Sequence, residues 1–185
     1  MPQAVLHTDR LTLVPLADEH LEFEVELDGD PEVMRFLEPR PRSRAEVVAV
    51  HTRRLASAVP GLGFWVGLVG GVPVGWWLLE PVLDGGEPVP GAAELGYRLL
   101  RRYWRQGLAS EGSRELLRHG FADLGLTRVI AQTMAVNAGS RATMAAVGMR
   151  HVRDFAEEWA EPLPGAEHGE VEYAVTREEW LAQRP

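Results

Sequence analysis

The chain has 185 residues, 45% of them hydrophobic and 25% charged, with 19 basic against 27 acidic residues and a formal net charge of -8. These values are typical of an ordinary globular protein, and we expect a single domain over residues 1–185. The acidic balance argues against partners such as nucleic acid or an anionic membrane, because both need a basic surface. No apolar run approaches the roughly 18 residues of a membrane span. Residues 1–10 do not resemble a signal peptide either, so we expect a cytoplasmic location.

The sequence contains no cysteine, and all 19 basic residues are arginine. The absence of cysteine and lysine excludes disulfides, thiolate metal sites, cysteine acyl-enzymes, Schiff-base chemistry and the lysine of a nucleotide-binding P-loop. His168, Glu170 and Glu172 have metal-like spacing. Three polar residues on one strand are usually a solvated face, so we predict no metal site.

Apolar spacing, capping residues and glycines predict the elements in chain order. They are a strand over 11–14; helices over 18–27, 30–36 and 43–59; a hairpin of strands 64–69 and 72–79; a loop over 81–91; a strand over 93–99; a helix over 108–124; a strand over 127–135; a helix over 140–147; strands over 149–155 and 171–175; and a short helix from 176. Capping boxes begin the helices at Ser43 and Thr176.

The strand over 93–99, the helix after it and the strand over 127–135 form a right-handed crossover, which predicts two parallel strands. The hairpin before them should be antiparallel. The fold class is therefore α/β, with a mixed, mostly antiparallel sheet and helices on both faces. Alternation sends the adjacent Trp76 and Trp77 to opposite faces of that sheet.

Residues 103–111, Tyr-Trp-Arg-Gln-Gly-Leu-Ala-Ser-Glu, join a predicted strand to a predicted helix. Backbone N–H groups and the positive end of the helix dipole converge at such a junction, and together they bind phosphate. Gly107 permits a conformation and a close approach that a side chain would block. We therefore predict a phosphate-bearing ligand, although an ordinary strand–helix turn has the same local pattern.

Residues 104–109, Trp-Arg-Gln-Gly-Leu-Ala, resemble the acetyl-CoA loop Gln/Arg-x-x-Gly-x-Gly/Ala of the GNAT superfamily of N-acetyltransferases. Trp104 departs from the first position of that pattern, but tryptophan is common there in the RimJ/RimL-like, ribosomal-protein N-acetyltransferase branch. The strand over 94–99 and the unit Asn137-Ala-Gly-Ser140 also match this branch. The chain resembles it over nearly its whole length. The resemblance implies a splayed parallel strand pair, acetyl-CoA as co-substrate and acyltransferase activity.

The resemblance also implies a donor site. Loop amides would hold the CoA pyrophosphate, with Arg105 near a phosphate; the strand backbone would pair with the pantetheine arm, and Asn137 would bond the pantetheine amides. Arg105 also fits a plain solvated arginine, and Asn137 a turn-forming asparagine. The predicted cofactor-binding residues are Tyr97, Leu99, Arg105, Gln106, Gly107, Leu108, Ala109, Ser110 and Asn137.

Direct attack of an amine on a thioester needs a base, help for the oxyanion and a proton for the leaving thiolate. Many relatives take that proton from a tyrosine on the helix after Asn137, but Met144 stands near that place here. We predict Ser140 as the substitute, although it also fits a helix N-cap. Glu94 is the predicted base because the family often places a glutamate on this strand. A structural or an exposed Glu94 fits equally well, and Glu80 is the second candidate.

The first interpretation is an acetyl-CoA-dependent N-acetyltransferase that acts on a primary amine in a ternary complex. The acceptor would be a small-molecule amine or a protein N-terminus, and the resemblance allows a homodimer. The second interpretation is a non-catalytic CoA-binding sensor or interaction module on the same fold, which the missing tyrosine favours. A fold by itself does not decide between them.

Overall fold

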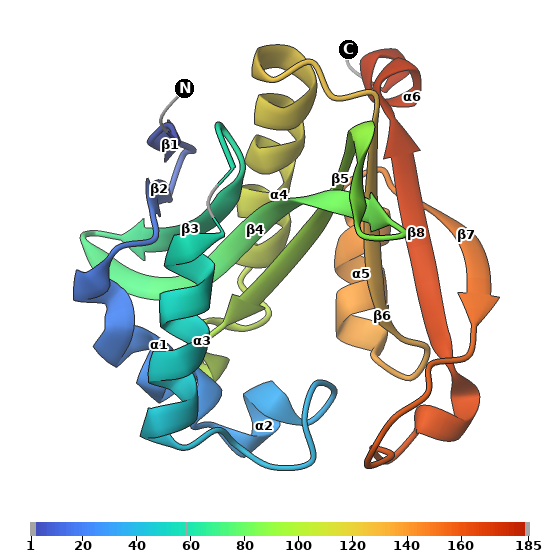
Figure 1. Ribbon diagram of the computed structural model, residues 1–185. Helices are drawn as coiled ribbons and strands as arrows, with labels where there is room; N and C mark the ends of the chain where they lie inside the picture. The colour runs from blue at the N-terminus through green and yellow to red at the C-terminus, as the bar shows by residue number, and fades with distance from the viewer. Residues whose placement is uncertain (1–2, 58, 184–185) are drawn as a thin grey trace.

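The structure is a computed structural model that describes residues 3–57 and 59–183 (Figure 1). Its eight-stranded sheet has the order β1-β2-β3-β4-β5-β6-β8-β7. The strands are β1 (Leu6–His7), β2 (Thr12–Pro15), β3 (Gly63–Val69), β4 (Val72–Asp84), β5 (Glu87–Leu99), β6 (Arg128–Met134), β7 (Arg150–Phe155) and β8 (Glu170–Thr176). The β5–β6 pair is parallel, and the other neighbouring pairs are antiparallel.

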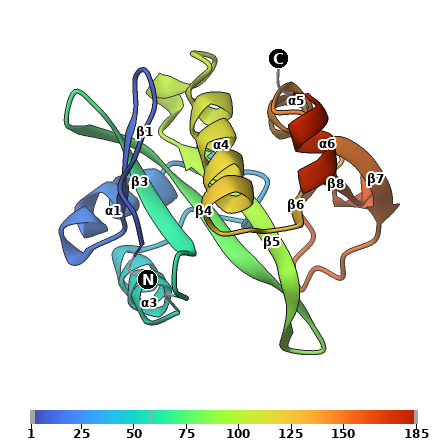
Figure 2. The same ribbon diagram turned by 90° about the horizontal axis from the view of Figure 1, so that it is seen from above.

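Helices cover both faces of this sheet (Figure 2). They are α1 (Leu21–Asp28), α2 (Pro31–Met34), α3 (Arg44–Ala56), α4 (Leu108–Arg118), α5 (Ala138–Ala146) and α6 (Arg177–Ala182), with short turns η1 (Asp18–His20), η2 (Arg101–Tyr103), η3 (His119–Asp123) and η4 (Ala166–His168). The mixed, mostly antiparallel α/β fold predicted from the sequence is confirmed. No helix in the described ranges is both long and apolar enough to cross a membrane.

The adjacent tryptophans lie in two different hydrophobic clusters, on opposite faces of the sheet, as strand alternation predicts. Trp77 is fully buried in the cluster beneath α4, and its Nε1 donates to the carbonyl of Ala109 at 3.1 Å. Trp76 lies in the other cluster, beneath α1, where its ring meets that of Phe64 edge-on at 5.3 Å between centroids. The sheet therefore has one face covered by α4 and α5 and one face covered by α1 and α3.

The predicted loop over 81–91 is wrong, because β4 and β5 extend through it as a second hairpin. The turn is Gly85-Gly86, with φ of 58° and 89°. Two consecutive positive φ angles match the right-handed twist of a tight hairpin, and glycine adopts them without strain. A register shift between Pro81 and Leu83 accommodates the proline within the ladder.

Both predicted capping boxes are present, at Ser43–Glu46 and Thr176–Glu179. The start of α5 differs from the prediction, because Asn137 rather than Ser140 is the N-cap. The Asn137 side chain accepts a hydrogen bond from the Ser140 N–H at 3.2 Å. An asparagine oxygen caps a helix as well as a serine hydroxyl does. Asn137 precedes Ser140 in the sequence and occupies the N-cap position. Ser140 consequently lies inside the first turn.

Candidate active site

A wedge opens between β5 and β6, and it is the central feature of the site. The two strands pair only over Ala92–Glu94 and Arg128–Ile130, and beyond Glu94 and Ile130 they diverge (Figure 1). This is the parallel splay expected from the family resemblance. Beyond Glu94, this edge of β5 has no paired strand among the described residues.

The backbone groups that face the wedge follow from strand alternation. Leu100 donates its N–H to the carbonyl of Val74 on β4, at 2.9 Å. In an antiparallel ladder, every second residue directs its N–H and C=O to the same neighbour. The backbone groups of Tyr97 and Leu99 are therefore directed away from β4 and into the wedge. This edge has the polar groups that an extended amide-containing ligand needs.

The glycine loop leads directly into α4. Gly107 is the N-cap in the left-handed region, with φ of 78°, and Glu111 makes the first intrahelical bond, to the Gly107 carbonyl at 3.0 Å. The helix leaves the N–H groups of Leu108, Ala109 and Ser110 without an intrahelical acceptor. These amides and the helix dipole favour an anion at this point.

Trp104 and Arg105 give the loop its shape. The Trp104 Nε1 donates to the carbonyl of Leu99 at 2.8 Å, which ties the loop to the end of β5. Arg105 has φ of 59° and is the one non-glycine residue in the described ranges with a positive φ. Gln106 Nε2 donates to the carbonyl of Arg102 at 2.9 Å. The tryptophan that departs from the general GNAT pattern thus has a structural role, and the Leu99 carbonyl already has one donor.

Tyr97 and Ser140 are brought together across the wedge. The Tyr97 hydroxyl lies 3.0 Å from both the carbonyl oxygen and Oγ of Ser140 on α5. Burial raises the pKa of Tyr97 to about 12, although hydrogen bonds with Ser140 and Thr143 act to lower it. The phenol thus keeps its proton at neutral pH and acts as a hydrogen-bonding group. Asn137, the N-cap of α5, also donates from Nδ2 to Thr133 Oγ1 at 3.0 Å.

Glu94 lies at the apex of the wedge, on the opposite face of β5 from Tyr97. Its neighbours Ala93 and Leu95 are buried in the cluster beneath α4, so alternation turns Glu94 toward the α1/α3 face. Burial raises the pKa of Glu94, and the negative charges of Glu80 and Glu172 raise it further. The pKa of Glu80 is also raised, by burial, against the charge of Arg54.

On the same side of the sheet as Glu94, β8 carries two more carboxylates, whose pKa values are shifted in opposite directions. Burial would raise the pKa of Glu172, but hydrogen bonds from Arg153 and Gln132 and the arginine charges outweigh it and lower the pKa. Glu170 is buried, and its Oε1 has no hydrogen-bond partner among the described residues. Burial and the charge of Glu157 raise its pKa to about 7.

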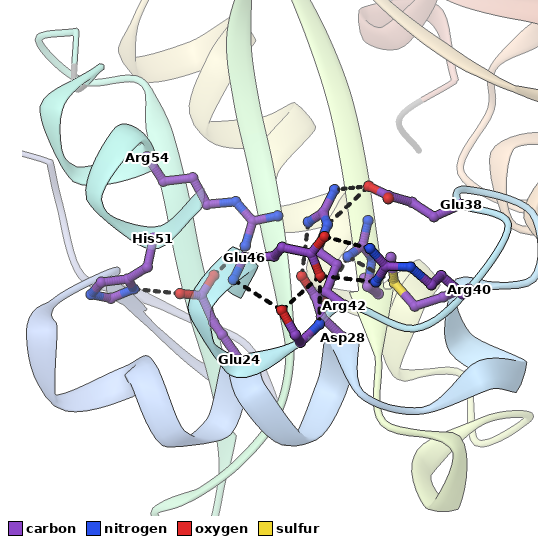
Figure 3. A network of polar contacts seen from close by, with 11 residues as sticks. Glu24, Asp28, Glu38, Arg40, Arg42, Glu46, His51 and Arg54 are labelled. Carbon is purple, nitrogen blue, oxygen red and sulfur yellow. Dashed lines mark hydrogen bonds and ion pairs between the residues drawn. The ribbon is translucent and has the colours of Figure 1, made fainter. Parts of the chain in front are cut away.

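A network of buried ion pairs holds the helices over the Glu94 face (Figure 3). Glu24 on α1 is completely buried and pairs with both His51 and Arg54 of α3. Asp28, also completely buried, pairs with Arg98 of β5 and with Arg42 Nη1 at 2.9 Å. Arg98 lies on the same face of β5 as Glu94, four residues further along the strand. The network therefore connects the α1 layer to the strand that carries the predicted base. No local sequence pattern predicts these contacts.

A cleft of about 890 Å³ lies over α4, next to the glycine loop. The turn between β1 and β2 forms one side, and the ends of α5 and α6 form the other. Residues that line it near the loop are Thr8, Arg10, Gly107, Ser110, Glu111 and Arg114. No group of three or more His, Cys, Asp or Glu side chains within 3–57 and 59–183 is arranged to hold a metal ion.

Comparison with known proteins identifies the family. A family model described as "Acetyltransferase (GNAT) domain" matches residues 10–150. The chain belongs to the GNAT acetyltransferase family. It is therefore an enzyme, an N-acetyltransferase, as the resemblance predicted.

The chain is 47% identical over 190 residues to a protein of Aspergillus fumigatus named FsC-acetyl coenzyme A-N(2)-transacetylase, a match that covers 99% of this chain and 81% of the relative. A GNAT-family acetyltransferase from Bacillus anthracis has the same fold, with a TM-score of 0.78, 20% identity, and 95% and 99% of the two chains covered. RimL, a ribosomal L7/L12 alpha-N-protein acetyltransferase in complex with coenzyme A, gives a TM-score of 0.79 at 18% identity, with 94% and 98% covered.

Proposed function

We propose that the whole chain works as one domain that transfers an acetyl group from acetyl-CoA to a primary amine, by direct attack within a ternary complex. One observation carries this proposal: β5 presents Glu94 on one face and Tyr97, with Ser140, on the other, at the point where its pairing with β6 ends. A thioester held in the wedge would be open to an amine from the Glu94 side and to a hydroxyl from the Ser140 side.

The donor would lie along the wedge and the loop. The amides from Gln106 to Ser110 would hold the pyrophosphate, and the β5 edge at Tyr97 and Leu99 would pair with the pantetheine arm. Arg105 would contribute a charge-assisted contact to a phosphate. Asn137 has its oxygen on the Ser140 N–H and its amide on Thr133, so it would meet pantetheine only through remaining hydrogen-bonding capacity.

In the reaction, Glu94 would take a proton from the acceptor ammonium through water, which frees the nitrogen lone pair. The nitrogen then bonds to the acetyl carbon, and the carbonyl electrons move onto oxygen. When the tetrahedral intermediate collapses, the carbonyl re-forms and the C–S bond breaks, with its electron pair going to sulfur. The nitrogen would lose its second proton, which would reach the thiolate through water. Ser140 Oγ would donate a hydrogen bond that stabilises this thiolate before it is protonated, with Tyr97 holding the Ser140 hydroxyl in place.

For the acceptor, we propose a small-molecule amine in preference to a protein N-terminus. The support is the name of the Aspergillus fumigatus relative, which specifies transfer to a nitrogen designated N(2). The likeness to RimL is below 25% identity and supports only the fold. Placement in the RimJ/RimL-like branch thus stays a prediction from the loop and Asn137 motifs. The cytoplasmic location and the homodimer also stay predictions.

The test is isothermal titration of the protein with acetyl-CoA, followed by a screen of amines for release of the CoA thiol. We expect saturable one-site binding near micromolar and thiol release with a subset of amines. Binding without thiol release from any amine would favour the non-catalytic CoA-binding module instead. No binding at roughly millimolar acetyl-CoA would mean that the loop is not a CoA site.

A further inference from the structure

The turn between β1 and β2 is fastened to the glycine loop by residues that the loop motif does not include. Thr8 Oγ1 donates to Glu111 Oε1 at 2.6 Å, and the backbone N–H of Arg10 donates to the same oxygen at 2.9 Å. Arg10 Nε donates to Glu111 Oε2 at 2.7 Å, while its Nη1 donates to the carbonyl of Gln106 at 2.9 Å. One guanidinium therefore bridges the loop and the first turn of α4.

The bond to Gln106 orients a peptide unit of the loop. The described residues contain no cis peptide bond. In a trans peptide the C=O and the following N–H point in opposite directions. Because the Gln106 carbonyl points at Arg10, the N–H of Gly107 points away from Arg10. That amide is one of those proposed to hold the pyrophosphate.

The bonds from Arg10 to Glu111 also neutralise a negative charge close to the N-terminus of α4. Glu111 lies in the first turn of α4, where an unpaired carboxylate would repel a phosphate bound at the helix N-terminus. The guanidinium of Arg10 neutralises it, with Nη2 2.5 Å from Oε2, and only 17% of the Glu111 side chain is exposed. The same contact that orients the loop thus removes an opposing charge.

We propose that Arg10 is a positioning residue for the acetyl donor: it aims the Gln106–Gly107 peptide and neutralises Glu111, so that the loop accepts the pyrophosphate of acetyl-CoA. This inference rests on the proposed function. Arg10 acts through the loop and not on the thioester, so its loss weakens use of the pyrophosphate and leaves the chemical step intact.

The experiment compares two donors, acetyl-CoA and S-acetylpantetheine, which has the thioester but lacks the pyrophosphate. The measured quantity is the ratio of their kcat/KM values. Arg10→Ala should lower this ratio by about tenfold or more, mainly through a higher KM for acetyl-CoA, because charge-assisted bonds to the loop are lost. The kcat/KM for S-acetylpantetheine should stay near that of the wild type.

A matched control is Arg44→Ala. Arg44 also forms a two-nitrogen pair with a glutamate of another helix, Glu22, and its side chain is 58% exposed. It lies at the start of α3 and outside the donor site, so the ratio should not change. A decrease in the Arg44 variant equal to that in the Arg10 variant would overturn the inference.

Arg10→Lys separates position from charge and replaces the alanine variant if that one does not fold. Lysine keeps the charge but cannot bond the Gln106 carbonyl and both Glu111 oxygens at once. We expect the Arg10→Lys variant to show most of the decrease in the kcat/KM ratio that the alanine variant shows. A ratio equal to that of the wild type would overturn the positioning role. If the wild type itself uses neither donor, the proposed function fails. If it strongly prefers acetyl-CoA and both Arg10 variants keep that preference, only this inference fails.

Discussion

Glu94 stands directly opposite Glu80 in the β4–β5 ladder, and both carboxylates have raised pKa values. Like charges directly opposite each other on neighbouring strands destabilise the pair. The repulsion between Glu80 and Glu94 is lowered when one of the two carboxylates holds a proton. A pair of this kind at the wedge apex is suited to receive a proton from an incoming ammonium.

Replacement of Glu94 by glutamine should therefore lower kcat by about 100-fold, the usual contribution of a general base, without a change in acetyl-CoA affinity. Steady-state kinetics and titration calorimetry measure the two quantities. Glu87→Gln, at an exposed position of the same strand, is the control and should behave as the wild type. Unchanged turnover in the Glu94 variant would remove this residue from the mechanism.

The Glu80 charge should be visible in the pH profile. A base works when deprotonated, so activity rises with pH through the Glu94 pKa, which burial and then Glu80 place above the ordinary value of 4.5. Glu80→Gln removes one of the charges that raise this pKa. The rising limb of kcat/KM, measured from about pH 5 to pH 8, should move to lower pH. A limb that stays in place or moves upward would contradict the coupling.

Ser140 and Tyr97 should behave as one unit. We expect Ser140→Ala to lower kcat by about tenfold or more, and Tyr97→Phe to lower it less, because the phenol only orients the serine hydroxyl. In the double variant the two effects should not add, since Tyr97 has nothing to orient once Ser140 is gone. Additive losses in the double-mutant cycle would show that the two hydroxyls act independently.

Gly112 allows α4 to lie close on the sheet. A Cβ at this position would stand 2.4 Å from Cε2 of Trp77. Gly112→Ala should therefore lower the free energy of unfolding by about 1–3 kcal/mol, the usual cost of overpacking. Gly139→Ala in α5 is the control, because its nearest contact would be 3.9 Å away. Urea unfolding of both variants checks the prediction, and equal stabilities would contradict it.

Glu170 should make stability depend on pH. Its folded-state pKa of about 7 is above the ordinary 4.5, first because of burial and then because of Glu157. A raised carboxyl pKa stabilises the fold at low pH, and this contribution is lost as pH rises from about 4.5 to about 7. With solvent screening of this partly accessible carboxyl taken into account, the loss would be on the order of 2–3 kcal/mol.

Glu170→Gln should remove that dependence, so the variant should gain stability relative to the wild type between about pH 5 and pH 8. Urea unfolding at the two pH values measures this difference. Glu167→Gln, at an exposed position of the preceding turn, is the control and should follow the wild type. A constant difference between the Glu170 variant and the wild type would mean that Glu170 does not titrate in this range.

The sequence by itself determined the features that neighbouring residues encode. Gly107 before a helix, the capping box at Ser43 and the alternation of Trp76 and Trp77 all follow from backbone sterics and hydrogen bonding over a few positions. The same local reasoning misread residues 81–91, because a glycine pair serves a tight hairpin as well as an open loop. Pairing of β4 with β5 beyond Glu80 distinguishes the two, and that pairing is not a local property.

Only the tertiary structure decided which distant side chains meet. Tyr97 reaches Ser140 over a separation of 43 residues, and Arg10 reaches Glu111 over a separation of 101. Neither contact leaves a spacing pattern in the chain, because each depends on strand register and on how closely α4 and α5 pack on the sheet. The sequence thus located the glycine loop through its backbone requirements, whereas the residues that contact the loop and the hydroxyls of the wedge became visible only once the strands were paired.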